Sequence, residues 1–311
     1  MLDHLDDYLL YLQTNNYSDE TVYNYERDLK LFENYLQNNN IKFDEINKKN
    51  IEQYKAWLNS RDRETAGGLS PAGDKKLLAR SINRTLSAIR GYLRYLIDLD
   101  YHCPIAPEVI KFIKTTKKHP QVAELYELIK LIEAPATLEK NTKVALRNRA
   151  MLELLFSTGL RISELINLKM DKINQSGKIF ILGKGKKERF AYLTPRAYKY
   201  LQNYLGKRQS DSPYVFIPYR GLNSSKKDKK ISANYLQMKI KQYREILHIN
   251  VPTSAHSLRH GFATYLAESG ANPAAIQILL GHESLDTTTR YVHISDRYAE
   301  KTHQDFHPLK R

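Results

Sequence analysis

Cysteine is almost absent from the sequence: Cys103 is the only one among 311 residues. A lone cysteine excludes a disulfide framework and any zinc or iron–sulfur site that needs several cysteines. It fits a reducing cytoplasm, where thiols stay free. The chain also lacks an apolar run near the ~18 residues of a membrane span, and its acidic beginning lacks the layout of a signal peptide. We therefore expect a soluble, cytoplasmic protein that does not bind a membrane.

Acidic residues are in the minority. The chain has 34 Asp and Glu against 49 Lys and Arg, which gives a formal net charge of +15 and a pI near 9.5. A folded protein this basic most often binds a polyanion, and nucleic acid is the leading candidate. With 41% apolar residues, the chain can form one large or two modest domains with real cores.

The first third of the chain is predicted to be helical. Apolar residues recur at three- and four-residue spacing over 18–38, 46–58 and 77–99. The last of these helices is predicted to enter a DNA groove, because it carries arginines away from its apolar side: Arg80, Arg84, Arg90 and Arg94. The alternative interpretation is a solvated basic face.

A change of composition divides the chain near residue 104. The following segment contains Pro104, Pro107 and several lysines, including Lys117 and Lys118 as expected DNA contacts. This composition predicts an extended basic linker that can lie along a DNA backbone. We expect two domains that clamp a duplex, a helical one at 1–103 and a second at 121–311, joined by the linker at 104–120.

Two charged residues follow a core helix predicted at 142–158 in the second domain. Arg161 and Glu164 lie one helical turn apart directly after this helix. An arginine near a core needs a carboxylate partner or an anion to hold. The pair therefore either closes a helix end or takes part in a binding site, and the residues alone leave both readings open.

A β-hairpin is predicted from the strand-like runs at 178–182 and 188–193. Glycines on both sides of Lys184 let the backbone approach a ligand, so this lysine can contact a phosphate or donate a proton. Two further lysines of the turn, Lys186 and Lys187, are expected to contact DNA. The turn is not a P-loop, because the Gly-Lys-Ser/Thr ending and the following helix are absent.

The stretch at 256–260 places His256 and Arg259 one helical turn apart, on one face. An imidazole beside a guanidinium suits a reacting phosphodiester, because a proton moves while charge develops on the non-bridging oxygens. His282 and Tyr291 follow later in the chain. Phosphoryl transfer without a metal needs cationic side chains, a nucleophile from the protein and an acid for the leaving alcohol. These residue types supply all three, and no carboxylate cluster of the kind that holds Mg²⁺ accompanies them, so we expect neither a metal nor a cofactor.

Five segments occur in an order that is highly specific: Thr158–Leu165, Gly183–Gly185, His256–His260, Leu280–Ser284 and Thr289–His293. In this order they resemble the motifs of the tyrosine recombinase (phage integrase) family, and the whole chain is similar to the short Xer-type members. The N-terminal half resembles the family's core-binding domain in helix pattern only. The resemblance implies a mainly α fold with a small β-sheet (α+β), with a SAM-like helical domain before the catalytic domain.

The resemblance also implies a role for each candidate residue. Tyr291 would attack the scissile phosphate and form a 3′-phosphotyrosyl link, which preserves the bond energy so that ATP is not needed. Arg161 and Arg259 would hold the non-bridging oxygens, and Glu164, at the family's acidic position, would support the arginine and the histidine. His256 would assist proton transfer at the tyrosine, and His282 would donate a hydrogen bond to the phosphate. Lys184 would protonate the leaving 5′ oxygen, with Lys186 as the alternative.

Strand exchange in this family implies four protomers on two double-stranded DNA sites, acting in pairs through a Holliday junction. The assembly would be a homotetramer or a heterotetramer with a paralogue, and a DNA translocase is a possible activator. The segment at 295–311 would dock on a neighbouring protomer or pack on its own domain. We expect a nucleoid-associated enzyme for chromosome or plasmid dimer resolution. The alternatives are a recombinase of a mobile element, a type IB topoisomerase and an inactive DNA-binding protein.

Overall fold

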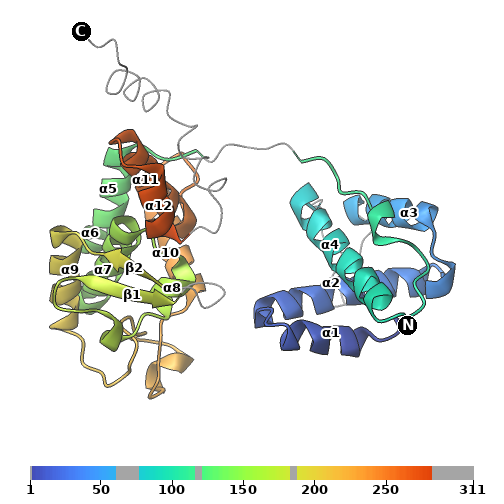
Figure 1. Ribbon diagram of the computed structural model, residues 1–311. Helices are drawn as coiled ribbons and strands as arrows, with labels where there is room; N and C mark the ends of the chain where they lie inside the picture. Colours follow the sequence, from blue (N-terminus) through green and yellow to red (C-terminus); the bar gives the residue numbers. More distant parts are fainter. Residues whose placement is uncertain (1, 61–76, 116–120, 183–187, 282–311) are drawn as a thin grey trace, which may run out of the picture. The chain divides into compact units, whose positions relative to one another are not determined.

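The computed structural model describes residues 2–60, 77–115, 121–182 and 188–281. It divides the chain into two compact units, Met1–Lys118 and His119–Arg311 (Figure 1). Several predicted site residues lie outside the described ranges: Lys117, Lys118, Lys184, Lys186, Lys187, His282 and Tyr291.

The described residues of the first unit form four α-helices, and these pack around one apolar core. They are α1 (Leu5–Thr14), α2 (Asp19–Asn38), α3 (Lys48–Asn59) and α4 (Ala79–Asp98). The helices predicted at 18–38, 46–58 and 77–99 are confirmed as α2, α3 and α4. Each is amphipathic because its apolar residues repeat with the helical period and so face the core together.

The segment after α4 differs from the predicted linker. Residues 104–113 pack on the first unit, where Ile105 and Ile110 are buried in its core and a short 3₁₀ turn, η2, spans Pro107–Val109. Asn83 on α4 fixes the end of this segment: its side chain donates to the carbonyl of Ile113 (2.9 Å) and accepts from the same residue's N–H (2.8 Å). The apolar residues spaced between the prolines and lysines explain the difference, because they gain more from burial than from an extended path.

The second unit is mostly helical around a buried central helix, α7 (Thr142–Thr158). Met151, Leu152 and Leu155 of α7 are completely buried. The elements around it are α5 (Leu125–Glu133), α6 (Pro135–Leu138), α8 (Ile162–Ile166), η3 (Met170–Lys172), β1 (Lys178–Leu182), β2 (Glu188–Tyr192), α9 (Pro195–Leu205), η5 (Leu222–Ser225), α10 (Ala233–Ile246), α11 (Ala255–Glu268) and α12 (Pro273–Leu280). The mainly α fold with a small β-sheet is confirmed.

The predicted hairpin is confirmed as an antiparallel pair in which Lys178 faces Tyr192 and Leu182 faces Glu188. Side chains alternate between the two faces of a strand, and the inward residues of β2 are Arg189 and Ala191. β2 contacts both α7 and α12. The hairpin therefore places a buried arginine against α8 and the end of α12.

Two glycines with left-handed backbone end the helices that border the site. Gly159 ends α7 with φ 63°, and Gly281 ends α12 with φ 63°. A Cβ at Gly159 would lie 2.5 Å from Cδ1 of Phe262 and 2.9 Å from Cδ2 of Leu280. Only glycine therefore permits both this conformation and the close approach of α11 and α12 to the end of α7.

Candidate active site

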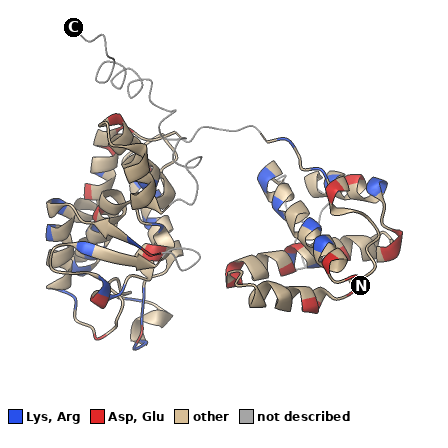
Figure 2. Cartoon of the chain, in the orientation of Figure 1, with Lys and Arg blue, Asp and Glu red and all other residues tan. Residues whose placement is uncertain are grey.

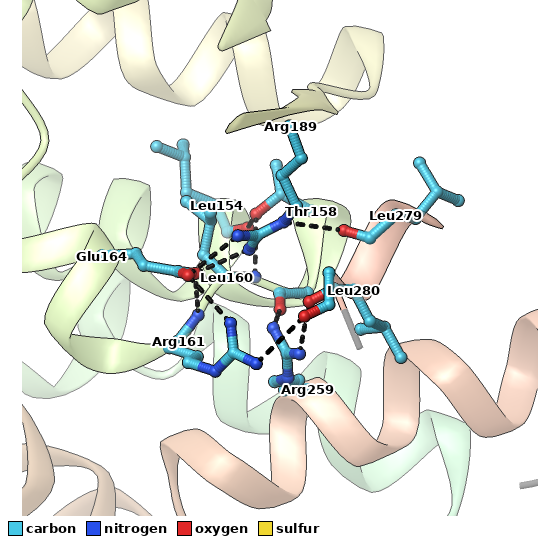
Figure 3. Close-up of polar contacts among 11 residues, drawn as sticks. Leu154, Thr158, Leu160, Arg161, Glu164, Arg189, Arg259, Leu279 and Leu280 are labelled. Atoms are coloured by element: carbon cyan, nitrogen blue, oxygen red, sulfur yellow. Dashed lines mark hydrogen bonds and ion pairs between the residues drawn. The ribbon is translucent and has the colours of Figure 1, made fainter. Parts of the chain in front are cut away.

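The site forms where the turn after α7 meets β2, the first half of α11 and the end of α12 (Figure 3). It brings together four of the residues predicted from the sequence, namely Arg161, Glu164, His256 and Arg259. It also contains Arg189, which lies in none of the motifs recognised in the sequence.

Glu164 on α8 is the anionic centre of the site, and its side chain is 8% exposed. Its two carboxylate oxygens accept from the backbone N–H of Arg161 (2.8 Å) and from the Arg161 guanidinium (3.0 Å). They also accept hydrogen bonds from both terminal nitrogens of Arg189, at 2.8 and 2.7 Å. Burial acts to raise the pKa of Glu164, but the hydrogen bonds and charge of Arg189, together with those of Arg161, hold it below its usual value.

Arg161 precedes α8 and combines the two readings that its sequence left open. Its N–H and the Glu164 carboxylate close the start of the helix. Its side chain nevertheless stays 37% exposed, and the contact of its guanidinium with the carbonyl oxygen of Gly281 is long, at 3.4 Å. The backbone of Arg161 is thus held in place while part of its charged group faces solvent, where an anion can reach it.

Arg259 on α11 is buried, with 3% of its surface exposed. It donates to the carbonyl oxygens of Gly159 (2.5 Å) and Leu280 (2.7 Å), so it joins the end of α7 to the end of α12. The last carbonyls of a helix have no partner within the helix and carry partial negative charge, which a guanidinium satisfies.

Three consecutive carbonyls at the end of α12 each accept from a different arginine, as Figure 3 shows for the first two. Leu279 accepts from Arg189 at 3.1 Å, Leu280 from Arg259, and Gly281 from Arg161. The end of α12 therefore fixes three cations close together. Arg189 is already paired with Glu164, so Arg161 and Arg259 are the candidates to hold an anion here, because guanidinium groups match phosphate oxygens in charge and geometry.

His256 begins α11 on the same side as Arg259, as its spacing predicts. Its Nε2 lies 2.7 Å from Nε2 of His260. Burial lowers the pKa of His256, and the charges of Arg259 and Arg161 lower it further. The imidazole is therefore poised to be neutral near pH 7, which is the form that can accept a proton.

Arg189 was missed because its sequence context reads as one more charge in a basic hairpin. The available signal was its register: in a strand whose alternate residues face the core, Arg189 falls on the same side as Ala191. A charged residue at an inward position requires a buried partner. That partner is Glu164, 25 residues earlier in the chain.

The arginines predicted to contact DNA lie on α4, whose basic positions are drawn in blue in Figure 2. Arg80 and Arg94 are exposed, and Arg94 pairs with Glu108 at 2.9 Å. Arg90 lies over the ring of Phe112. Arg84 instead faces its own unit, where it donates to buried Asp28 at 2.8 Å and to Asn24. DNA contact by these residues stays a prediction.

Within the described parts of the chain, no group of three or more His, Cys, Asp or Glu side chains could hold a metal ion. The expectation that the reaction uses no metal stays a prediction. Over the same parts, none of the helices is long and apolar enough to cross a membrane.

Comparison with known proteins covers both units. Residues 122–297 match the Phage integrase family, and residues 5–99 match the description Phage integrase, N-terminal SAM-like domain. The chain is 32% identical to the tyrosine recombinase XerD of Staphylococcus epidermidis over 312 residues, which cover 98% of each chain.

Solved structures show the same fold. The crystal structure of XerA recombinase is 25% identical, with a TM-score of 0.52 over 98% of this chain and 99% of that one. The XerH site-specific recombinase bound to palindromic difH substrate, a post-cleavage complex, is 23% identical, with a TM-score of 0.71 over 91% of this chain and 79% of that one. At this identity the second likeness concerns the fold alone.

Proposed function

The chain belongs to the phage integrase family, and from this membership we propose how its residues cut and rejoin DNA. It is a tyrosine-type site-specific recombinase, an enzyme that cleaves DNA strands and rejoins them to new partners. The observation that carries the proposal is the convergence of Arg161, Arg259 and His256 at the ends of α7 and α12. A scissile phosphate placed there meets two guanidinium groups and one neutral imidazole.

The proposed first step is attack of the Tyr291 oxygen on the scissile phosphorus. The phosphorus–oxygen bond to the 5′ carbon breaks, the DNA 3′ phosphate becomes a tyrosine ester, and the 5′ oxygen leaves as a hydroxyl. Neutral His256 accepts the proton from the tyrosine. Lys184, or Lys186 in the alternative assignment, donates the proton that the leaving oxygen takes up. Attack of a 5′ hydroxyl from another strand reverses the step, so no external energy source is consumed.

Arg161 and Arg259 stabilise the charge that develops on the non-bridging oxygens during this step. Removing one such donor typically slows a reaction by about 10²–10³-fold. Arg259 is held by two carbonyls and so is preorganised, whereas partly exposed Arg161 can turn toward the phosphate as it arrives. His282, which directly follows Gly281, is proposed to donate a hydrogen bond to the same phosphate.

We propose that the biological reaction is Xer-type resolution of chromosome or plasmid dimers in the cytoplasm, on nucleoid DNA. Relatedness to XerD over almost the whole chain supports this assignment. The proposed assembly is a tetramer on two DNA sites, built from this chain alone or together with a paralogue, with the segment at 295–311 linking neighbours. A DNA translocase is the proposed activator. The first unit is proposed to clamp the duplex through α4 and the basic segment that follows it.

Covalent trapping tests the proposed reaction. The full-length protein is incubated with sheared genomic DNA of its source organism, denatured, and the protein-linked fragments are recovered and sequenced. We expect an adduct at one chromosomal site that disappears in Tyr291→Phe, a change that removes only the nucleophilic hydroxyl. An adduct that persists in Tyr291→Phe would refute the assignment of the nucleophile. Adducts confined to the ends of a mobile element would refute dimer resolution.

A relaxation assay separates recombination from topoisomerase activity. A type IB topoisomerase relaxes supercoiled plasmid without a partner site. For this protein we expect product formation to depend on two copies of the trapped site. Relaxation of a plasmid that lacks the site would contradict site-specific recombination.

A further inference from the structure

Arg189 holds three parts of the second unit together. It lies on β2, and its side chain is only 6% exposed. Its two terminal nitrogens donate to the Glu164 carboxylate at 2.8 and 2.7 Å, and its Nε donates to the carbonyl of Leu279 at 3.1 Å (Figure 3). One rigid, planar group therefore connects the hairpin to α8 and to the end of α12.

The contact with Glu164 controls Arg161. Both oxygens of Glu164 are shared, each accepting once from Arg189 and once from Arg161. Without Arg189, the carboxylate would keep only its two bonds to Arg161 and would lose the group that fixes its orientation. Rotation of the carboxylate would carry the Arg161 guanidinium with it, since the two are directly bonded.

The contact with α12 controls the helix end that precedes residue 282. Beyond the bond to Leu279, the side-chain stem of Arg189 packs on Gly281: a Cβ there would lie 2.9 Å from Cδ of Arg189. The same helix end accepts from Arg259 and Arg161. A shift of Arg189 would therefore displace the helix end that Arg259 and Arg161 contact, and with it the two arginines that face the proposed phosphate.

We propose that Arg189 is a positioning residue for DNA cleavage: it does not touch the phosphate, but it sets Arg161 through Glu164 and holds the end of α12 in register with Arg259. This inference rests on the proposed function. Lysine cannot replace it fully, because an ammonium on a flexible stem lacks the fork that bonds both oxygens of Glu164 and Leu279 at once.

The competing explanation is a buried ion pair that only stabilises the fold. The chain contains a matched pair for comparison. Arg149 on α7 has a side chain that is 5% exposed, and it bonds Glu153 (3.0 and 2.8 Å) and Glu133 (3.2 Å). These two carboxylates pair with Arg149 and Arg196, not with the arginines of the site. Substitutions at Arg149 thus remove a similar buried pair outside the site.

The first experiment compares Arg189→Gln and Arg189→Lys with Arg149→Gln and Arg149→Lys in the full chain. DNA carrying the trapped site is used to measure the single-turnover rate of adduct formation at saturating DNA and the DNA concentration that gives half the maximal rate. For Arg189→Gln we expect a rate loss of about 10²-fold, the scale of a misplacement near 1 Å. Arg189→Lys should recover part of it.

The half-saturating DNA concentration should change by less than about threefold in Arg189→Gln, because the phosphate contacts themselves remain. The melting temperature, measured by circular dichroism, should fall by a similar amount in the Arg149 and Arg189 variants. Equal rate losses in the two series would show that Arg189 acts through stability alone and would overturn the proposal.

A second measurement does not need DNA or activity. In ¹⁵N-labelled protein, the side-chain Nε–Hε signal of Arg161 reports how firmly its guanidinium is held. We expect this signal to shift and broaden in Arg189→Gln and to stay unchanged in Arg149→Gln. An unchanged Arg161 signal in Arg189→Gln would overturn the positioning role, whereas absence of any adduct from the unsubstituted protein would count against the proposed function instead.

Discussion

The Nε2 atoms of His256 and His260 lie 2.7 Å apart across one turn of α11, with the rings at an interplanar angle of 84°. A hydrogen bond at this distance requires one nitrogen to carry a proton and the other to have none. If both rings were fully protonated, neither Nε2 could accept a hydrogen bond and two positive charges would lie in contact, next to Arg259 and Arg161. The arrangement therefore favours a pair with at least one neutral ring.

The first prediction concerns the acid side of the pH–rate profile. Burial, then the charges of Arg259 and Arg161, lower the pKa of His256 from its usual value of 6.5. Its neutral form, the proposed base, should persist as pH falls through 6.5, and the rate of adduct formation should decline only below that value. The measurement is the single-turnover rate from pH 5 to 8, with His256→Asn as the control that lacks this titration. A midpoint above 6.5 would contradict the prediction.

The same shift affects stability. Because His256 binds a proton less readily in the folded chain than in the unfolded one, the unfolded chain holds more protons below pH 6.5. The free energy of unfolding should therefore decrease as pH falls below 6.5, and this part of the decrease should be absent in His256→Asn.

The second prediction separates the two site arginines by stability. Arg259→Ala leaves the buried carbonyls of Gly159 and Leu280 without their donors, so it should lower the melting temperature by about 5–10 °C. Arg161→Ala removes a partly exposed group and should change it less. Each change should slow adduct formation by about 10²–10³-fold. Calorimetry measures the melting temperatures and covalent trapping measures the rates on the same samples. Equal melting temperatures for the two variants would argue against the buried role of Arg259.

The third prediction concerns Glu164→Gln, which keeps the size of the side chain but removes its charge. At pH 7 it should destabilise the protein by about 3–5 kcal/mol, because Arg189 is left buried without a counter-ion. The pKa of Glu164 is lowered in the folded chain, so its contribution is fully present above the ordinary value near ~4.3 and is lost as pH falls through the folded pKa. Urea unfolding of both proteins should show a gap at pH 7 that narrows below pH ~4.3; a constant gap would contradict this account.

The fourth prediction concerns Arg147, a buried arginine on α7 that does not belong to the site. It donates to Asn148, to the carbonyl of Ile217 at 2.9 Å and to the hydroxyl of Tyr235, and it lies over the rings of Tyr219 and Tyr235. Arg147→Met should cost about 3 kcal/mol of stability, because it takes this donor from the carbonyl of Ile217 and removes the bonds to Asn148 and Tyr235. Adduct formation at a temperature where the variant is folded should be nearly unchanged, and a large rate loss there would link this network to catalysis.

The fifth prediction distinguishes two arginines of α4 in DNA binding. Arg80 is exposed, so Arg80→Ala should weaken binding and reduce the slope of log affinity against log salt by about 1. Arg84 bonds buried Asp28, so Arg84→Ala should chiefly lower the melting temperature. Fluorescence anisotropy at several salt concentrations, together with thermal unfolding, measures both. An unchanged salt slope in Arg80→Ala would remove it from the DNA interface.

Local order in this protein follows from the sequence by itself. The spacing of apolar residues determined α2, α3 and α4, since a helix buries a face whose residues repeat every three or four positions. The same logic placed Arg161 with Glu164 and His256 with Arg259, because residues one turn apart share a face. Side-chain acceptors that begin helices, such as Ser18 for α2, are equally local.

Only the tertiary structure decided which of these local pieces meet. Arg189 finds Glu164 across 25 residues, Arg84 finds Asp28 across 56, and Arg259 finds Gly159 across 100. None of these pairs has a signature in spacing, because each depends on how whole helices and strands pack. A buried charge must be paired, but the sequence does not say with which partner, and that choice made Arg189 part of the site and directed Arg84 into the fold.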